Sequence, residues 1–147
     1  MPKKVRRAGF FCLLVLLLGA TGCRRAPDEA QIRQAIEMAV QATAKGDASA
    51  VVDPLTSDFD GNHGVMSRED LGNLLRVAKL RGETLHAAVG TIDVLPRGER
   101  YVADFTVTLA RGGTWLPAQW DVYKVETAWR REGRDWRCYE ATWVRQF

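Results

Sequence analysis

Apolar residues in the first part of the chain recur with the period of an amphipathic helix. The clearest stripe follows Asp28, where five positions fall at i, i+3, i+4, i+7 and i+8: Ile32, Ala35, Ile36, Ala39 and Val40. Asp28 is expected to cap this helix, with Gln31 at capping-box spacing, and Gly46 is expected to end it. Asp47 predicts a second, shorter helix, whose length Pro54 limits and whose apolar positions are Val51, Val52 and Leu55.

A third helix is predicted after a polar segment of turn-forming residues. Residues 57–64, Ser-Asp-Phe-Asp-Gly-Asn-His-Gly, have the composition of a loop. Ser67 is expected to cap the helix that follows, with Asp70 at the matching position, and Gly82 is expected to close it. Its apolar stripe, expected to face the core, consists of Leu71, Leu74, Leu75 and Ala78.

Beyond Gly82 the apolar period changes to two, which is typical of strands with one buried face. The alternating runs cover residues 85–89, 101–109, 121–131 and 136–145, and the connections include residues 96–99, 111–113 and 132–135. Helices followed by an antiparallel meander predict an α+β fold. We expect three N-terminal helices to pack against a strongly curved, mostly antiparallel sheet that encloses a cone.

The first 22 residues have the three parts of a secretory signal peptide. Basic residues open the chain, an apolar run of 11 residues follows from Ala8 to Leu18, and small residues lead into Cys23. This arrangement resembles a bacterial lipobox, which implies that Cys23 is lipidated and becomes the mature N-terminus. A plain cleaved signal and an uncleaved anchor are the alternatives, although the apolar run is shorter than the ~20 residues of a spanning helix. The expected division is residues 1–22 as signal peptide, 23–27 as lipidated end and tether, and 28–147 as one domain.

Removal of the signal peptide changes the charge balance of the chain. The full sequence has 21 basic and 18 acidic residues, and four of the basic residues lie in the signal. The mature chain therefore carries 17 basic and 18 acidic residues, a net charge of −1, which argues against a nucleic-acid partner. Cys138 becomes the one cysteine available to the domain, so no disulfide can form within it, and a buried, inert thiol is expected.

In the order of their predicted helices and strands, their length and their turn residues, residues 28–145 resemble the NTF2-like superfamily, which includes SnoaL-like and ketosteroid-isomerase-like proteins. The resemblance rests on the opening helix, the Lys45-Gly46-Asp47 break, Asp58-Phe59 as the end of helix two, and the turn Gly133-Arg134-Asp135-Trp136-Arg137. Residues 58–64 followed by a helix resemble NTF2-like lipoproteins of Gram-negative bacteria. Arg24, rather than Asp, follows Cys23, which by resemblance to enterobacterial sorting favours the outer membrane facing the periplasm.

The resemblance implies a cone, but it does not choose between a small apolar ligand in its interior and a partner protein on its sheet face. Candidate pocket residues are the aromatic side chains on the expected inner faces of the strands, together with Phe59 and with His63 at the mouth: Phe59, His63, Tyr101, Phe105, Tyr123, Trp129 and Trp136. Two histidines 23 residues apart, His63 and His86, lack metal-ligand spacing, so no metal is expected, and no motif indicates a cofactor.

The orientation of the last strand decides whether a carboxylate enters the cone. If Trp136, Cys138, Glu140, Thr142 and Val144 face inward, Glu140 could act as a general base of a lyase or isomerase. If Tyr139, Ala141 and Trp143 face inward, the pocket has no carboxylate. Arg137 and Arg145 favour the first orientation, because charges prefer solvent. Tyr139 and Trp143 would then form an outward aromatic patch, and related folds often form homodimers through that face.

The sequence thus predicts a membrane-anchored periplasmic lipoprotein with one NTF2-like domain. The expected function is non-catalytic: the domain binds a small apolar molecule in the cone or a partner protein on the sheet face. An enzyme that uses Glu140 is the alternative.

Overall fold

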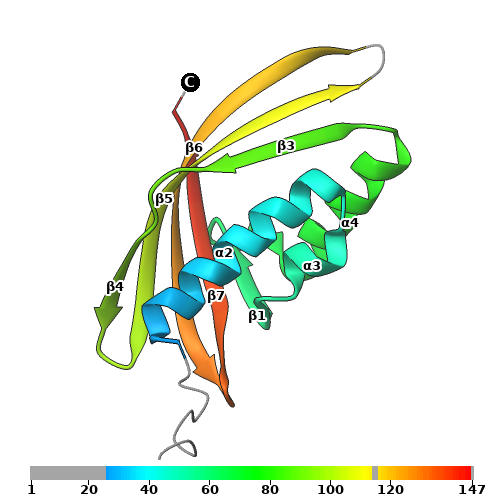
Figure 1. Cartoon of the computed structure of the whole chain (residues 1–147). Helices are drawn as coiled ribbons and strands as arrows, with labels where there is room; N and C mark the ends of the chain where they lie inside the picture. The colour runs from blue at the N-terminus through cyan, green and yellow to red at the C-terminus, as the bar shows by residue number, and fades with distance from the viewer. Residues whose placement is uncertain (1–25, 114–115, 147) are drawn as a thin grey trace, which may run out of the picture.

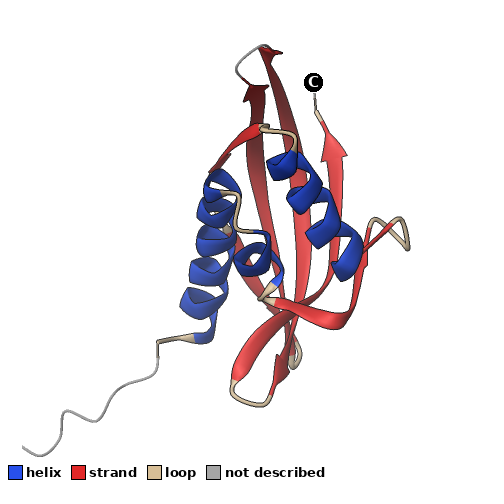
Figure 2. Cartoon of the chain, turned by 90° about the vertical axis from the view of Figure 1, so that its right-hand side faces the viewer, coloured by secondary structure: helices blue, strands red, loops and turns tan. Residues whose placement is uncertain are grey.

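The computed structural model describes residues 26–113 and 116–146, which form one curved sheet with helices on its concave side (Figures 1 and 2). The helices are α2 (Asp28–Lys45), α3 (Ala48–Val52) and α4 (Arg68–Leu80). The strands are β1 (Leu55–Gly61), β2 (Met66–Ser67), β3 (Thr84–Val89), β4 (Asp93–Arg97), β5 (Arg100–Gly113), β6 (Leu116–Glu132) and β7 (Asp135–Arg145). The α+β architecture predicted from the sequence is confirmed.

The sheet has the order β2-β1-β7-β6-β5-β3, and β4 also pairs with β5. All pairings are antiparallel except that of β1 with β7. β3 and β4 share one edge of the long strand β5, so the sheet continues on both sides of Gly90. The segment containing Pro96 was expected to be only a connection, but it lies in β4, an edge strand that tolerates the missing N–H of proline.

Helix α2 has a regular C-cap but no side-chain cap at its N-terminus. Gly46 ends it in the left-handed conformation, φ 63°, as expected. The expected capping by Asp28 is wrong, because Pro27 occupies the N-cap position and makes no side-chain cap. The Asp28 carboxylate instead accepts hydrogen bonds from Arg131 Nη2 (2.8 Å) and Trp136 Nε1 (2.9 Å). The start of α2 is therefore tied to the far end of the sheet.

The segment after α3 is a strand rather than the expected loop. Asp47 caps α3 through its carboxylate, which accepts from Ala50 N at 3.1 Å, but the helix ends at Val52. Leu55, expected in this helix, and Asp58-Phe59, expected at its end, lie in β1. Thr56, Phe59 and Gly61 are buried and the intervening polar residues face solvent, so β1 is half-buried beside β7.

The turn between β1 and β2 extends the β1–β7 pairing by one residue. Asn62 has a positive φ of 48°, and its N–H donates to Ala141 O at 2.9 Å. The Asn62 side chain accepts from Trp143 N at 2.8 Å and donates to Trp143 O at 3.4 Å. His63 also has a positive φ, 57°, but its side chain is exposed. The two residues share a backbone conformation, and only Asn62 adds tertiary hydrogen bonds.

Helix α4 begins as expected but is not buried as expected. Ser67 and Asp70 form a capping box, with Asp70 N donating to Ser67 Oγ and Ser67 N donating to Asp70 Oδ2. The predicted core stripe is wrong, since Gly72 is the one buried residue of α4 and Leu74 is 56% exposed. The reason is that α4 packs against α3, β1 and β2 and stands away from the central strands.

The core lies between α2 and the inner face of β5, β6 and β7. Ile32 is fully buried and Trp129 is 2% exposed. Trp129 Nε1 donates to Thr127 Oγ1 (2.9 Å), which donates to Ala103 O (3.2 Å), so the polar groups of these two core side chains are satisfied. All buried members of the core cluster lie between Ile32 and Ala141, so they are contained in residues 24–147. Among the described residues, no helix has the length and apolar character needed to cross a bilayer.

The outer face of the sheet carries a charged cluster over Tyr139. Arg130 donates to Asp58 from its two terminal nitrogens, Nη2 at 2.7 Å and Nη1 at 3.1 Å, and Nη2 also donates to Glu132 at 2.7 Å. The guanidinium carbons of Arg130 and Arg100 lie 5.5 and 5.1 Å from the centre of the Tyr139 ring. The Arg130 guanidinium lowers the pKa of the Asp58 carboxyl from 3.8 to about 2.

Substitution of Asn62 by Ala is expected to lower the free energy of unfolding by about 2 kcal/mol, because two hydrogen bonds are lost and Ala is strained at positive φ. His63→Gly is the matched control and is expected to be neutral or slightly stabilising, since glycine favours this φ and His63 makes no tertiary contact of this kind. Urea unfolding measures both. Equal effects of the two substitutions would contradict the role assigned to the Asn62 side chain.

The Arg130–Asp58 pair is expected to stabilise the fold only where Asp58 is ionised. A lowered pKa means that its contribution is full above the unfolded-state pKa of about 4 and is lost as the pH falls through about 2. The difference in unfolding free energy between the wild type and Asp58→Asn should shrink over this range at low salt. Asp53→Asn, at a looser pair 4.0 Å from Arg137, serves as the control. A difference that stays constant down to pH 2 would exclude this linkage.

Candidate functional site

A bulge in β7 determines which of its side chains face the interior. Cys138 pairs with Trp129 and Glu140 pairs with Ala128, so Tyr139 is an extra residue between them. Before the bulge Trp136 and Cys138 face inward, and after it Ala141 and Trp143 do. Each of the two orientations considered from the sequence is therefore correct for one half of the strand.

The expected inward orientation of Glu140 is wrong. Glu140 pairs with Ala128 of β6 and Asp60 of β1, and it is not among the residues that line the interior cavity. The bulge turns its side chain to the outer face. The hypothesis of a general base at this position thus loses the carboxylate that it requires.

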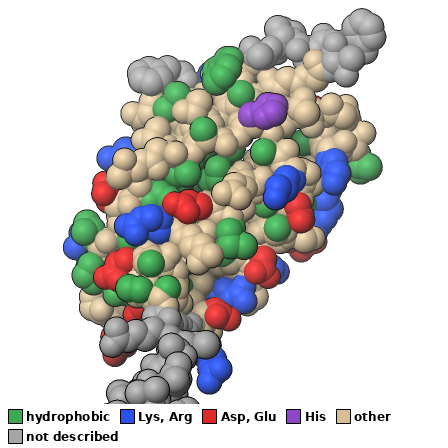
Figure 3. Space-filling model, viewed as in Figure 1, with side chains coloured by type: hydrophobic (Ala, Val, Ile, Leu, Met, Phe, Trp, Pro, Cys, Tyr) green, Lys and Arg blue, Asp and Glu red, His purple; other side chains and the backbone are tan. Residues whose placement is uncertain are grey.

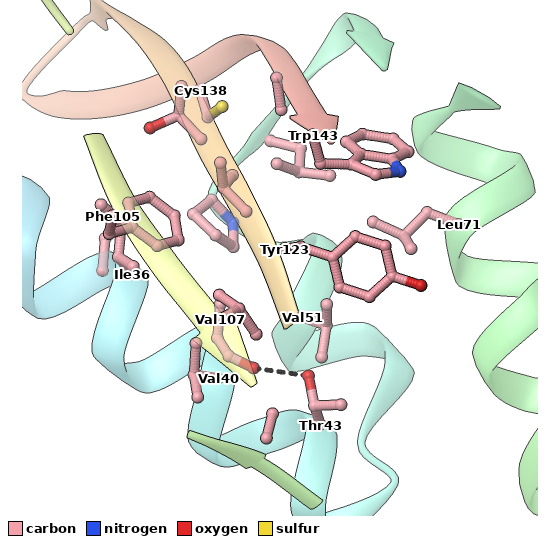
Figure 4. Close-up of a pocket in the computed structure, with 18 of the residues that line it drawn as sticks. Ile36, Val40, Thr43, Val51, Leu71, Phe105, Val107, Tyr123, Cys138 and Trp143 are labelled. Carbon is pink, nitrogen blue, oxygen red and sulfur yellow. Dashed lines mark hydrogen bonds between the residues drawn. The ribbon is translucent and has the colours of Figure 1, made fainter. Parts of the chain in front are cut away.

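The interior of the cone contains an open cavity of about 430 Å³ (Figure 4). One wall is the inner face of the sheet, from β5, β6 and β7 with a contribution from β3. The opposite wall is formed by α2, α3 and α4, and α4 contributes Leu71 and Leu74. The exposure of Leu74 has its explanation here, because the apolar side of α4 borders the cavity rather than a packed core.

The structure places four of the seven predicted pocket residues in the cavity wall: Phe59, Phe105, Tyr123 and Trp129. Tyr101 and Trp136 lie outside the wall, next to the start of α2. Their rings form an edge-to-face pair with centres 4.9 Å apart. Burial raises the pKa of the Tyr101 hydroxyl, and Glu29 beside it raises it further. His63 lies in the exposed β1–β2 turn and not in the cavity wall.

The predicted aromatic patch on the outer face is not present as expected. Trp143 faces the cavity, because the bulge puts it in register with Val125. Tyr139 faces outward, but Arg100 and Arg130 stack on its ring, and Arg100 Nη1 donates to its hydroxyl at 3.2 Å. The outer face around Tyr139 is therefore charged rather than apolar.

Most polar groups in the cavity wall already have partners. Thr43 Oγ1 donates to Ala39 O at 3.0 Å, and the Thr127 hydroxyl and Trp129 N–H are bonded as described above. The Cys138 thiol donates to Glu140 O at 3.3 Å, and burial raises its pKa to about 12, which keeps it protonated at neutral pH. The predicted buried, inert thiol agrees with this environment.

Figure 3 shows apolar side chains gathered near the middle of this face, with charged side chains around them. No charged side chain belongs to the described cavity wall. In residues 26–113 and 116–146, no three His, Cys, Asp or Glu side chains come together as metal ligands.

The predicted pocket residues did not include Trp143, Leu71, Leu74 or Asp121, although an inward Trp143 was one of the two orientations considered and the leucines were expected to face the core. Asp121 lies two residues before Tyr123 on the same face of β6, and it forms a salt bridge with Arg145. The period-two pattern of 121–131 contains the signal for Asp121, because it shares the parity of Tyr123.

No protein-family model and no curated protein sequence matches this chain. Solved structures share its fold at low identity. An NTF2-like protein of unknown function from Pseudomonas putida KT2440 is 18% identical, with a TM-score of 0.64 over 81% of this chain and 87% of that chain. A proposed dehydratase of the NTF2-like family from Streptomyces avermitilis is 15% identical, with a TM-score of 0.67 over 82% and 96%.

A proposed aromatic-ring hydroxylase from Novosphingobium aromaticivorans is 14% identical, with a TM-score of 0.72 over 84% of this chain and 93% of that chain. The activities named for these proteins differ, while the arrangement of helices and sheet is common to them. The described domain of this chain has the NTF2-like fold, the α+β cone predicted from its sequence.

Proposed function

We propose that this protein binds a small apolar molecule in the cavity of its NTF2-like domain and does not transform it. The observation that carries the proposal is the composition of the wall, which is apolar apart from a few hydroxyl, indole and thiol groups and includes no charged side chain. A volume of about 430 Å³ lies within the ~300–1,000 Å³ of small-molecule sites. Burial of apolar ligand surface would supply the binding free energy.

The wall also supports binding rather than acid–base catalysis. A general acid or base needs a pKa near the working pH, and the Cys138 thiol, with a pKa of about 12, does not meet that condition. Glu140, the base considered from the sequence, faces away from the cavity. The proposed dehydratase and hydroxylase share only the fold with this chain, and fold alone does not transfer an activity.

Anchoring is the second part of the proposal. Cys23 lies outside the described residues, and its sequence context supports lipidation and export to the periplasmic face of the outer membrane. Helix α2 begins at Asp28, so only residues 24–27 would separate the domain from the lipid. A protein partner or a second copy on the outer sheet face stays a prediction, although Trp143 no longer contributes to that face.

Ala39→Phe is expected to weaken ligand binding about tenfold or more, because Ala39 lines the cavity and the larger ring occupies ligand space. Met38→Phe is the matched control on the outer side of the same helix, where Met38 is 61% exposed. The measurement is a titration of residues 24–147 with the neutral fluorescent dye N-phenyl-1-naphthylamine. Equal loss of binding in both variants, or no loss in either variant, would contradict the cavity as the binding site.

Cys23→Ser is expected to abolish membrane retention, because the lipid is the proposed anchor. The wild-type protein should fractionate with membranes and incorporate labelled palmitate, whereas the variant should remain a precursor or become soluble in the periplasm. Unchanged retention of the variant would contradict lipid anchoring at this residue.

A further inference from the structure

Two hydrogen-bond donors in the cavity wall have no acceptor among the described residues. They are the hydroxyl of Tyr123 and the indole N–H of Trp143. Both residues are half-buried, so ligand or solvent can reach them. Every other polar group of the wall donates to a group on the protein: Thr43, Thr127, Trp129 and Cys138. The unused donating capacity of the cavity is therefore concentrated in these two side chains.

The two donors lie on the same side of the cavity. Trp143 of β7 pairs with Val125 of β6, so Trp143 and Tyr123 are diagonal neighbours on one face of the sheet. In Figure 4 the Tyr123 hydroxyl and the Trp143 nitrogen both point toward helix α4, and Leu71 lies beside them. The side chains that α4 contributes to the wall, Leu71 and Leu74, offer no acceptor. Because the described residues offer neither donor an acceptor, both are available to a bound molecule or to water.

A pair of opposite charges lies beside Tyr123 in the sheet. Arg145 pairs with Tyr123 in the β6–β7 register and forms a salt bridge with Asp121, two residues along β6. An anionic ligand would have to draw Arg145 away from Asp121 or leave its own charge unpaired beside an apolar wall, and both are costly. The electrostatics thus favour a neutral acceptor.

We propose that the natural ligand is a neutral, predominantly apolar molecule with one carbonyl-type acceptor at the end that lies against Tyr123 and Trp143. This inference rests on the proposed function and specifies its ligand class. The apolar body lies against the aliphatic and aromatic wall toward Phe105 and Ile36, and the carbonyl oxygen accepts from the two donors at the α4 side. The apolar wall provides most of the affinity, while the donors provide orientation and selectivity.

Three probes of matched shape test this ligand class: 2-ethylnaphthalene, 2-acetylnaphthalene and 2-naphthoate. They differ in having no acceptor, a neutral carbonyl and a carboxylate. Displacement of N-phenyl-1-naphthylamine from residues 24–147 at pH 7.4 gives their relative affinities. The ketone is expected to bind about tenfold more tightly than the hydrocarbon, because it satisfies donors that the hydrocarbon leaves unpaired. The carboxylate is expected to bind less tightly than the ketone.

The variants Tyr123→Phe and Trp143→Phe remove one donor each. Each is expected to reduce the ketone preference several-fold while the hydrocarbon still binds, which shows that the cavity remains formed. Tyr101→Phe is the matched control, because Tyr101 lies on the neighbouring strand β5, outside the cavity wall, and its hydroxyl contacts Glu29. The ratio of ketone to hydrocarbon affinity should be unchanged in this control.

Equal affinity for ketone and hydrocarbon, or a ketone preference that survives in both donor variants, would overturn the ligand class and leave apolar binding intact. Tightest binding of 2-naphthoate would also overturn it, since the site would then select an anion. If neither the dye nor any of the three probes binds, the proposed function fails and this inference fails with it.

Discussion

The bulge at Tyr139 determines which side chains of β7 line the cavity. The even-numbered side chains face the interior before the bulge, and the odd-numbered ones face it after the bulge. Trp136 and Cys138 face inward before it, and Ala141 and Trp143 after it. An unbroken strand would place Glu140 in the cavity and Trp143 on the outer face. One extra residue therefore exchanges a carboxylate for an indole in the cavity wall, which supports the proposed binding role rather than general-base catalysis.

The position of α4 is the second constraint on the cavity. Its apolar side is not covered, because the helix packs on α3, β1 and β2 at the edge of the cone. Asn62 stabilises this edge by bonding both the N–H and the carbonyl of Trp143, so the β1–β2 turn and the inward part of β7 are held together. At the opposite end, Asp28 ties the start of α2 to Arg131 and Trp136. The core is closed at the Asp28 end, and α4 borders the cavity.

Periodicity in the sequence predicted α2, α4, β5 and β6 because apolar residues recur along each of them at the period of a helix or a strand. Phe105, Tyr123 and Trp129 were placed in the wall for this reason. β1 was not predicted, since its Ser, Asp and Gly residues are turn formers and its strand conformation depends on pairing with β7, more than 70 residues away. The bulge leaves no local signal in an alternating run. An apolar stripe such as Leu71 and Leu74 has the same pattern whether it borders a core or a cavity.

Methyl NMR of residues 24–147 during titration with N-phenyl-1-naphthylamine tests most directly whether the cavity is a binding site. The methyl resonances of Leu71, Leu74, Val107 and Val125 are expected to shift together, because these side chains line the cavity. Those of Val65, Leu80 and Val144 are expected to stay in place, because these side chains are 74%, 86% and 64% exposed outside it. Shifts at the exposed residues without shifts at the cavity residues would contradict a binding function of the cone.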